Sequence, residues 1–283
     1  MSDAVADAAA RLTGHAVVGP GGHGAPARVD LDDGTTVVVK QGEGVRAEAA
    51  GLRWLAAAGA VAVPAVRGAD ASWLVSDQVP PGGATAAAAE AFGRELAALH
   101  AAGADAFGSP PPGGPVEAWI GMAPMRNVTG ATWAPWYAEH RVRPYLRLTV
   151  ARGAIDDRGA RTVEDVCARL DEEAAGGPPE PPARCHGDLW TGNVLWDGER
   201  AWVIDPAAHG GHRESDLAML ALFGAPHLAR ILAAYDEAAP LAAGWRDRVG
   251  LHQLFPLLVH AALFGGGYGR QAADAADRAL HRS

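Results

Sequence analysis

A change of pattern near residue 80 limits the folds that this chain can adopt. Before it, short apolar segments rich in β-branched residues alternate with turns, whereas longer segments with helical periodicity prevail after it. The run from Pro80 to Gly83 lies between the two parts, and such a run interrupts helices and strands alike. The sequence therefore predicts an α+β protein with a small strand-rich lobe over residues 1–80 and a larger, mainly helical lobe over residues 81–283.

The first part contains several segments of strand type and one helical segment. Asp33 and Gly34 form a hairpin signal because they lie between two β-branched runs. An Ala-rich segment from Val45 to Ala58 predicts a helix that ends at Gly59. The expected strands cover residues 15–19, 27–31, 35–40, 61–66 and 72–79.

The second part is expected to be mainly helical. Loops rich in proline and glycine are expected over residues 109–115 and 176–182. Between Cys185 and Pro206 the pattern changes to loop, strand, turn and strand. The expected helices cover residues 84–100, about 133–150, about 163–173 and most of the chain from Ser215 onward.

Charge and composition exclude several classes of protein. The chain has 24 Lys and Arg against 33 Asp and Glu, and the formal net charge of -9 argues against nucleic acid as a partner. No apolar run is long enough to cross a bilayer, and the first residues lack the basic flank and apolar stretch of a signal peptide. We therefore expect a cytoplasmic protein without membrane contact. Its two cysteines, Cys167 and Cys185, lack CxxC spacing and are expected to be reduced thiols.

Lys40 is the only lysine of the chain, which otherwise uses arginine for its basic residues. It ends an expected strand, and Glu48 follows in the next helix on a stripe shared with Leu52 and Leu55. A carboxylate on an apolar stripe needs a partner, and an ammonium group held by it can be aimed at a phosphate of ATP. A solvated partial ion pair is the alternative interpretation.

The run from Gly19 to Gly24 fits the pattern GxGxxG. A dinucleotide-binding fingerprint requires a helix directly after the last glycine, whereas a second strand follows here. We therefore interpret the run as a glycine-rich hairpin that folds over phosphates, with an ordinary flexible turn as the alternative. Its candidate phosphate-binding residues are Gly21, Gly22 and Gly24.

The densest group of reactive side chains lies in and before the hairpin that precedes Pro206. If this hairpin turns about Gly198, Asn193 and Asp205 meet at its open end, near enough to hold one oxygen-seeking cation together. A regular ladder would place the two side chains on opposite faces, so some irregularity at the strand end is required. Asp188, in the preceding loop, is expected in the same space as a carboxylate able to accept a hydroxyl proton. An acidic loop that caps helices is the alternative.

Histidines and tryptophans near this hairpin suit structural roles better than chemical ones. His186 is expected to form structural hydrogen bonds. His209 and His212, followed by Glu214, have HxxH spacing, but a glycine loop does not place two imidazoles on one face as a helix does. Structural or substrate-facing histidines are therefore favoured over a zinc site. Tryptophans are usually core residues, and only Trp190, inside the loop, is a candidate substrate contact.

Longer segments around these residues resemble the fructosamine kinase, or ketosamine 3-kinase, family, which is related to aminoglycoside phosphotransferases and choline kinases. The strongest likeness lies in HGDLWTGNVLW and in the later WVIDPAAHGGHRESDLAMLALFG. Residues 120–148 and 254–271 resemble further stretches of that family. The resemblance spans about Val17 to Gln271. It implies a protein-kinase-like fold, with ATP between a nucleotide lobe built on an antiparallel sheet and a mainly helical lobe.

The resemblance also implies roles for the residues already singled out. Lys40 and Glu48 resemble a pair that binds phosphate, and Asp188 resembles the base that faces the acceptor hydroxyl. Asn193 and Asp205 resemble ligands of Mg²⁺.

Further positions take their expected roles from the same resemblance. Asp216 resembles a buried aspartate that braces the catalytic loop and is expected to be structural. Asp77 and Val79 belong to a segment that would contact adenine through backbone groups, and His209 and His260 are candidate acceptor contacts. The glycine-rich turn lacks a cysteine that many members of the family carry, which removes a redox switch at that place.

The implied reaction is transfer of the γ-phosphoryl group of ATP to the 3-hydroxyl group of a ketosamine, with Mg²⁺, leading to deglycation. The ketosamine can be a small molecule or bound to a protein, and we expect the enzyme to be a monomer. A kinase of the same fold that acts on another hydroxyl, such as that of an aminoglycoside or an amino alcohol, is the alternative. A nucleotide-binding pseudokinase is the third possibility, disfavoured by the presence of Lys40, Asp188, Asn193 and Asp205.

Overall fold

The computed structural model describes residues 2–21, 26–171 and 176–281. Its helices are α1 (Asp3–Thr13), α2 (Val45–Ala56), α3 (Ala86–Ala101), α4 (Trp133–Tyr137), α5 (Arg143–Ala151), α6 (Asp157–Asp171), α7 (Arg213–Phe223), α8 (Leu228–Ala238), α9 (Trp245–Phe264) and α10 (Tyr268–Leu280). Its strands are β1 (Val17–Pro20), β2 (Ala27–Leu31), β3 (Thr36–Gln41), β4 (Val66–Ala69), β5 (Trp73–Asp77), β6 (Glu117–Ile120), β7 (Ala123–Arg126), β8 (Ala183–Cys185), β9 (Val194–Trp196), β10 (Ala201–Val203) and β11 (His209–Gly211). A π-helical turn (Ala138–Val142) joins α4 to α5, and a 3-10 turn (Thr191–Asn193) precedes β9.

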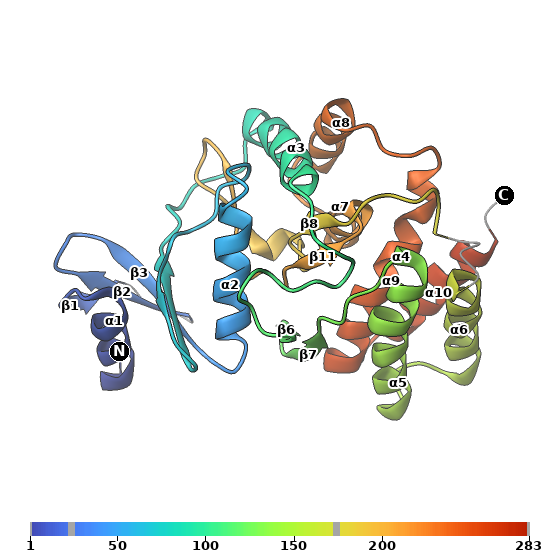
Figure 1. Cartoon of the computed structure of the whole chain (residues 1–283), viewed down its shortest axis with the longest axis horizontal. Helices are drawn as coiled ribbons and strands as arrows, with labels where there is room; N and C mark the ends of the chain where they lie inside the picture. Colours follow the sequence, from blue (N-terminus) through green and yellow to red (C-terminus); the bar gives the residue numbers. More distant parts are fainter. Residues whose placement is uncertain (1, 22–25, 172–175, 282–283) are drawn as a thin grey trace.

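The first five strands form an antiparallel sheet in the order β1-β2-β3-β5-β4. Helix α1 covers one face of this sheet and α2 covers the other (Figure 1). Side chains alternate along β3, so Val37 and Val39 pack under α1, whereas Lys40 reaches the face that α2 covers. The hairpin predicted at Asp33 and Gly34 joins β2 to β3, and Gly34 adopts a φ of 83° in its turn.

The strand predicted over residues 61–66 is wrong. Ala62 forms only an isolated bridge with Trp202, and β4 begins at Val66. Pro64 explains the difference, because a proline has no N–H group to donate to a strand ladder. Helix α1 has no counterpart in the prediction, since its buried face consists largely of alanines and gives a weak apolar signal.

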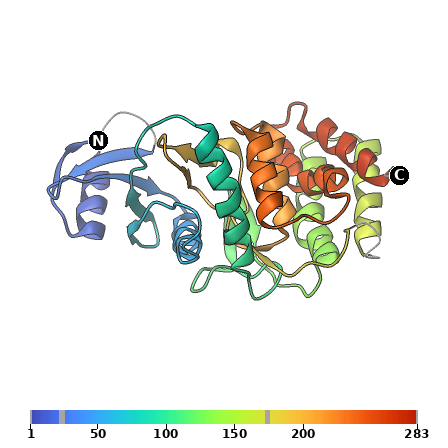
Figure 2. The same ribbon diagram turned by 90° about the horizontal axis from the view of Figure 1, so that it is seen from above.

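The second part is mainly helical, as predicted, and lies beyond α2 along the long axis of the molecule (Figures 1 and 2). Helix α3 packs against α8, and α9 packs against α5, α7 and α10. The helix expected near residues 133–150 consists of α4, the π-helical turn and α5 in succession. The ladders of β6 with β7 and of β8 with β11 were not predicted. Helices α1 and α10 lie at opposite ends of the molecule.

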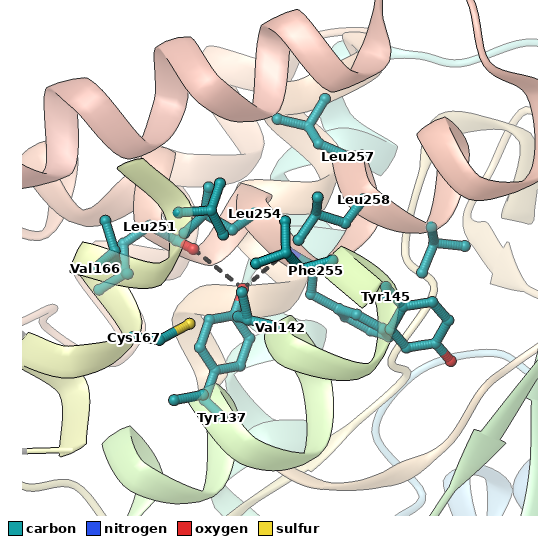
Figure 3. Close-up of a cluster of buried hydrophobic side chains, with 14 of the residues drawn as sticks. Tyr137, Val142, Tyr145, Val166, Cys167, Leu251, Leu254, Phe255, Leu257 and Leu258 are labelled. Atoms are coloured by element: carbon teal, nitrogen blue, oxygen red, sulfur yellow. Dashed lines mark hydrogen bonds between the residues drawn. The ribbon is translucent and has the colours of Figure 1, made fainter. Parts of the chain in front are cut away.

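Tyr137 repairs a gap in the backbone hydrogen bonding of α9 (Figure 3). Pro256 lies inside α9 and has no N–H group, so the carbonyl group of His252 lacks its helical donor. The Tyr137 hydroxyl lies 3.1 Å from that carbonyl oxygen and 3.0 Å from the carbonyl oxygen of Leu251, and it accepts the N–H of Phe255 over 3.1 Å. The surrounding core is apolar, and this burial raises the pKa of Tyr137.

Strands β9 and β10 form the hairpin predicted before Pro206, with Trp196 opposite Ala201. The described chain thus follows the expected order of loop, strand, turn and strand here, and the loop contains the added 3-10 turn. Among the helices of the described ranges, none combines the length and apolar character that crossing a membrane requires.

Candidate active site

A cavity of about 560 Å³ lies between the five-stranded sheet, α2 and the segment that precedes β9. The predicted site residues that line it are Lys40, Glu48, Asp188, Trp190, Asn193 and Asp205. Folding brings these side chains together although Lys40 and Asp205 are 165 positions apart in the sequence. Trp119 and Met122 of the unpredicted β6–β7 hairpin contribute another wall of the cavity.

Lys40 is the cation of this cavity. Its Nζ donates to Oε1 of Glu48 over 2.6 Å and also contacts Oδ1 of Asp205. Burial by itself would lower the pKa of Lys40, but the charges of Glu48 and Asp205 outweigh burial and raise it. The ammonium group therefore stays charged in a largely buried position. Glu48 is the partner expected from the sequence, and Asp205 is an additional one.

Asp205 supplies the irregularity that the sequence requires at the end of the hairpin. The ladder continues as far as Ile204, whose N–H donates to the carbonyl oxygen of Asn193 over 3.0 Å. Asp205 then adopts a φ of 54°, in the left-handed region that residues other than glycine seldom occupy. This break in the strand lets its carboxylate contact Lys40 while Asn193 contacts Asp188.

Asp188 and Asn193 are joined by hydrogen bonds across the 3-10 turn. Nδ2 of Asn193 donates to the carbonyl oxygen of Asp188 over 2.9 Å and to its carboxylate Oδ2 over 3.1 Å. Gly187 makes the bend before Asp188 possible, because its φ is 82° and a Cβ there would lie 2.2 Å from the carbonyl oxygen of Ala207. The loop thus fixes the Asp188 carboxylate from both its backbone and its side chain.

The Asp188 carboxyl group is buried at the base of the cavity, with 9% of the residue exposed. This burial, with smaller contributions from the charges of Asp205 and Asp216, raises the pKa of Asp188 to about 7. The hydrogen bond from Asn193 acts in the opposite direction and is the weaker effect. A carboxyl group with a pKa near neutrality is suited to accepting a proton from a substrate hydroxyl.

Asp216 holds the same loop from its other side. Its carboxylate accepts the N–H of His186 over 2.7 Å and that of Gly187 over 3.0 Å, and it lies 3.1 Å from Nε2 of His100. Burial would raise the pKa of Asp216, but these partners outweigh it and lower the pKa. His100 and Tyr235, which are joined by a hydrogen bond of 2.8 Å, complete this support and were not predicted.

His186 and His209 both lie behind the cavity. Nε2 of His186 bonds to the carbonyl oxygen of Ile204 over 2.9 Å, and its Nδ1 accepts the N–H of Asp188 over 3.2 Å. His209 is buried beside the ring of Trp136, with 5.8 Å between the ring centroids, and does not line the cavity. The expectation that His209 contacts the acceptor is therefore corrected: pairing of β11 with β8 places it in the interior.

Trp190 lines the cavity with 36% of the residue exposed. Gly192 makes room for its indole ring, since a Cβ at Gly192 would lie 2.3 Å from a ring carbon. The indole meets Phe223 edge to face at 5.8 Å between centroids, and Phe223 in turn lies 4.9 Å from the ring of His260. His260 thus supports Trp190 through Phe223, and it is not among the residues that line the cavity.

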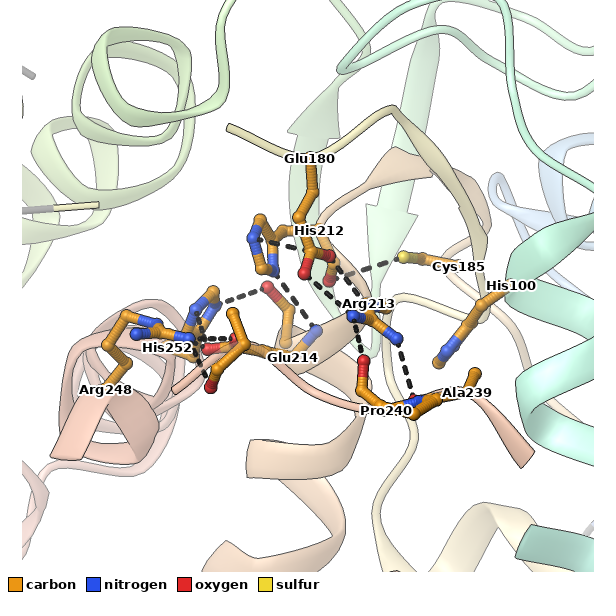
Figure 4. A network of polar contacts seen from close by, with 12 residues as sticks. His100, Glu180, Cys185, His212, Arg213, Glu214, Ala239, Pro240, Arg248 and His252 are labelled. Carbon is orange, nitrogen blue, oxygen red and sulfur yellow. Dashed lines mark hydrogen bonds and ion pairs between the residues drawn. The ribbon is translucent and has the colours of Figure 1, made fainter. Parts of the chain in front are cut away.

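A second polar network lies near the start of α7 (Figure 4). Arg248 donates to both carboxylate oxygens of Glu214, over 2.5 and 2.9 Å, and Nε2 of His252 lies 3.3 Å from the same carboxylate. His212 accepts the N–H of Glu214 at Nδ1 over 3.2 Å. His212, Glu214 and His252 converge as metal ligands do. However, the arginine occupies the carboxylate and the amide occupies a ring lone pair, so this arrangement suits a hydrogen-bonded network better than a metal centre.

The residues expected to contact adenine lie at the end of β5. The N–H of Asp77 donates to the carbonyl oxygen of Ala65 over 2.9 Å, and its carboxylate accepts from Arg67 over 2.5 Å. The backbone N–H and the carboxylate of Asp77 are therefore both engaged within the protein. Within the described chain the N–H of Val79 has no such partner, which leaves it available to a ligand.

Gly21 is the last described residue of the glycine-rich run. Its N–H donates to the carbonyl oxygen of Arg28 over 2.9 Å, and a Cβ there would lie 2.6 Å from Cγ2 of Thr36. Close packing against the neighbouring strands therefore requires glycine at this position. Gly22 and Gly24, also expected to bind phosphate, lie outside the described residues.

Comparison with known proteins gives consistent likenesses. The family described as fructosamine kinase matches residues 37–282. A protein of Synechocystis named "Probable ketoamine kinase" is 36% identical over 233 residues, or 80% of this chain and 75% of that protein. The chloroplastic protein-ribulosamine 3-kinase of Arabidopsis thaliana is 32% identical over 212 residues, or 73% of this chain and 61% of that protein. A crystal structure from Thermobifida fusca, provisionally named a fructosamine-3-kinase, is 48% identical with a TM-score of 0.92, and each chain is covered in full (100%). The kinase-like fold predicted from the sequence is thereby confirmed.

Proposed function

The chain belongs to the fructosamine kinase family, and on this premise we propose that it transfers the γ-phosphoryl group of ATP to the 3-hydroxyl group of a ketosamine. The observation that carries the proposal is the convergence of Lys40, Asp188 and Asp205 on one cavity. Relatives more than 30% identical are named as kinases of ketoamines or of ribulosamines, so another alcohol as the acceptor is not favoured.

ATP is proposed to bind between the lobe of residues 1–80 and that of residues 81–283. The N–H of Val79, which has no partner in the described part of the chain, would donate to the adenine, and Lys40 would neutralise part of the phosphate charge. Glu48 holds the Lys40 ammonium group in place and keeps it paired when no nucleotide is bound. We also propose that the protein acts in the cytoplasm, where ATP is available.

Asn193 and Asp205 fit a magnesium ion by the chemistry of their donors. The amide nitrogen of Asn193 is engaged with Asp188, which leaves its amide oxygen as the remaining donor atom. One carboxylate oxygen of Asp205 contacts Lys40, and the other completes an all-oxygen pair of the kind that Mg²⁺ prefers. Bound with ATP, Mg²⁺ would supply charge neutralisation at the phosphates.

Asp188 is proposed to be the catalytic residue. It orients the 3-hydroxyl group and accepts its proton as the new bond to phosphorus forms, while Asn193 keeps the carboxylate in position. Trp190 gives the acceptor an apolar surface at the mouth of the cavity, with His260 behind it. Catalysis of this kind relies on positioning and electrostatics more than on covalent chemistry with the protein.

The product explains a role in deglycation. A phosphate on C3 lies β to the carbonyl group on C2, so the product can eliminate inorganic phosphate and, after hydrolysis, release the amine. The sugar, which no longer carries the phosphate, is thereby lost from the amine.

The test is a panel of acceptors with the purified protein and MgATP. Fructosamines, ribulosamines, an aminoglycoside and an amino alcohol are compared by ADP release, and products are located by mass spectrometry of glycated lysine and of a glycated protein. We expect turnover of ketosamines with one added phosphate. Turnover of another alcohol without turnover of any ketosamine would reject the proposal, and MgATP binding without any turnover would favour a pseudokinase.

A further inference from the structure

Arg141 is a buried cation that the proposed mechanism does not use. It lies in the π-helical turn, is 1% exposed, and stacks on the ring of Trp136 at 4.6 Å. One guanidinium nitrogen donates to the carbonyl oxygen of Arg126 over 3.0 Å, and the other terminal nitrogen donates to Oδ1 of Asn127 over 2.9 Å. In residues 2–21, 26–171 and 176–281, no carboxylate forms an ion pair with it.

Burying the Arg141 guanidinium in this way would lower the stability of the folded protein if the side chain only filled space. Removing a guanidinium from water without an acidic partner is unfavourable, and burial lowers the pKa of Arg141 to about 10. A neutral side chain of similar size would occupy the same volume without that cost. What arginine adds is a rigid planar fork that holds two acceptors in a fixed relation, which lysine or methionine cannot do. π-Helical turns also occur often near functional sites.

The two acceptors lie at the root of the β6–β7 hairpin. Arg126 is the last residue of β7, and Asn127 follows it. The N–H of Asn127 donates to the carbonyl oxygen of Val116, just before β6, over 2.8 Å. Trp136, on which the guanidinium stacks, donates from Nε1 to the carbonyl oxygen of Val128 over 2.7 Å. The side chains of Arg141 and Trp136 thus hold both the end of β7 and the turn that follows it in place.

The other end of this hairpin forms a wall of the active-site cavity. Trp119, Gly121 and Met122 line the cavity together with Asp188 and Trp190. Met122 at the tip is 67% exposed, whereas Ile120 and Ala123 beside it are buried in the core, and the carbonyl oxygen of Pro124 accepts from the Tyr145 hydroxyl over 2.6 Å. The ladder pairs Glu117 to Ile120 with Ala123 to Arg126 without a break, so a shift at the root is passed along the ladder to the tip.

We propose that Arg141 is a positioning residue that sets the acceptor-side wall of the cavity by fixing the root of the β6–β7 hairpin. The proposal rests on the proposed function, because it takes this wall to face the ketosamine. Arg141 itself touches neither substrate. Without its fork, the root of the hairpin would lose two hydrogen bonds and the wall would shift, and acceptor binding would weaken more than ATP binding, which we place on the side of the five-stranded sheet.

The test compares Arg141→Met with Arg143→Met in steady-state kinetics on the best ketosamine of the panel. For Arg141→Met we expect the KM of the acceptor to rise about tenfold, with kcat within about threefold and the KM of ATP within about twofold of the wild type. Arg143 follows two residues later and pairs with Glu164 and Asp171 of α6 over 2.8 and 2.6 Å, away from the hairpin. Its variant is expected to lose stability but to keep the KM of the acceptor.

Arg141→Lys separates the fork from the charge, since it keeps the charge and cannot hold both acceptors. It is expected to raise the KM of the acceptor as Arg141→Met does, and a wild-type KM in either variant would overturn the proposal. If Arg141→Met does not fold, Asn127→Ala decides, because it removes one acceptor and leaves the arginine: a rise of about threefold supports the proposal and an unchanged KM opposes it.

Hydrogen exchange of residues 117–126 provides a readout that does not depend on turnover. We expect faster exchange in this hairpin for Arg141→Met than for Arg143→Met. Equal exchange in the two variants would contradict the proposal that Arg141 fixes the root of the hairpin. Absence of turnover by the wild type on every ketosamine would count against the proposed function alone. The two proposals can therefore fail separately.

Discussion

The two sides of the loop that begins at His186 hold buried carboxylates with opposite properties. Asp216, on the side away from the cavity, accepts two backbone N–H groups, is paired with His100, and has a lowered pKa. Asp188, on the cavity side, has one side-chain donor, Asn193, and a pKa raised to about 7. Burial acts on both carboxylates alike, and the supply of donors decides the difference. A carboxylate that accepts several hydrogen bonds stabilises the loop, whereas a carboxylate with a single donor remains available to a substrate.

The largest expected effect of a substitution is at Asp188. Asp188→Asn keeps the size of the side chain but cannot accept a proton, so phosphoryl transfer should fall by at least about a hundredfold. MgATP binding, measured by calorimetry, should be retained, and the variant should remain folded. Activity close to that of the wild type would remove the distinction between the two sides of the loop.

Asp216→Ala should act mainly on stability. The change leaves two backbone N–H groups and His100 without their acceptor in the interior, and we expect a loss of about 3 kcal/mol in the free energy of unfolding. Denaturant unfolding measures it, with Asp188→Asn as the matched variant on the cavity side. A variant of Asp216 that kept its stability but lost its activity would place this carboxylate with the chemistry instead.

The pH dependence of the wild type should report the Asp188 carboxyl group. The proton acceptor must be ionised, so kcat/KM should fall about tenfold for each pH unit below about 7 and level off above it. A profile that stays flat between pH 5 and pH 8 would contradict the assignment of Asp188 as base.

Stability should respond to the same group with the opposite slope. The pKa of Asp188 in the folded protein, about 7, lies above its ordinary value of 3.8, so the folded state binds the proton more strongly. Stability contributed by this group is present below about pH 4 and is lost as the pH rises to 7. The unfolding temperature of Asp188→Asn, measured relative to the wild type, should therefore increase over this interval. A constant difference would be the contrary result.

The smallest effect is expected for Glu48→Gln. Lys40 would keep its contact with Asp205, and the glutamine oxygen can still accept a hydrogen bond, so kcat/KM for ATP should fall only about fivefold. Glu237→Gln, at an exposed position of α8 that does not line the cavity, is the control and should leave kcat/KM unchanged. A loss as large as that of Asp188→Asn would show that the Lys40 pair is as critical as the base.

The site was predictable from the sequence where its signals are local. Counting residues along the hairpin predicted that Asn193 and Asp205 lie close together at its open end. Because side chains alternate between the two faces of a regular ladder, the same count also predicted an irregular strand end, which the structure has at Asp205. His209 was misplaced because only the pairing of β11 with β8, two strands far apart in sequence, decides which way it points. His100 reaches Asp216 across 116 positions, and nothing in its neighbourhood indicates that partner.

The fold shows the same division. The sheet of the first part follows from β-branched runs and one Asp-Gly turn, whereas the β6–β7 hairpin has no strong turn or strand signal of its own. A weak signal did exist for its root: Asn127 is one of only two asparagines in the chain, and the other is Asn193. Both asparagines use their side-chain amides to fix a neighbouring segment, but the sequence does not show which segment each of them fixes.

Helices α1 and α10 occupy opposite ends of the long axis, each in a different lobe and both remote from the cavity. A fluorescent donor on one helix and an acceptor dye on the other would therefore be placed without obstructing either ligand. Energy transfer between the dyes would report the distance between the two ends of the molecule in solution, and its value with MgATP could be compared with its value without the nucleotide.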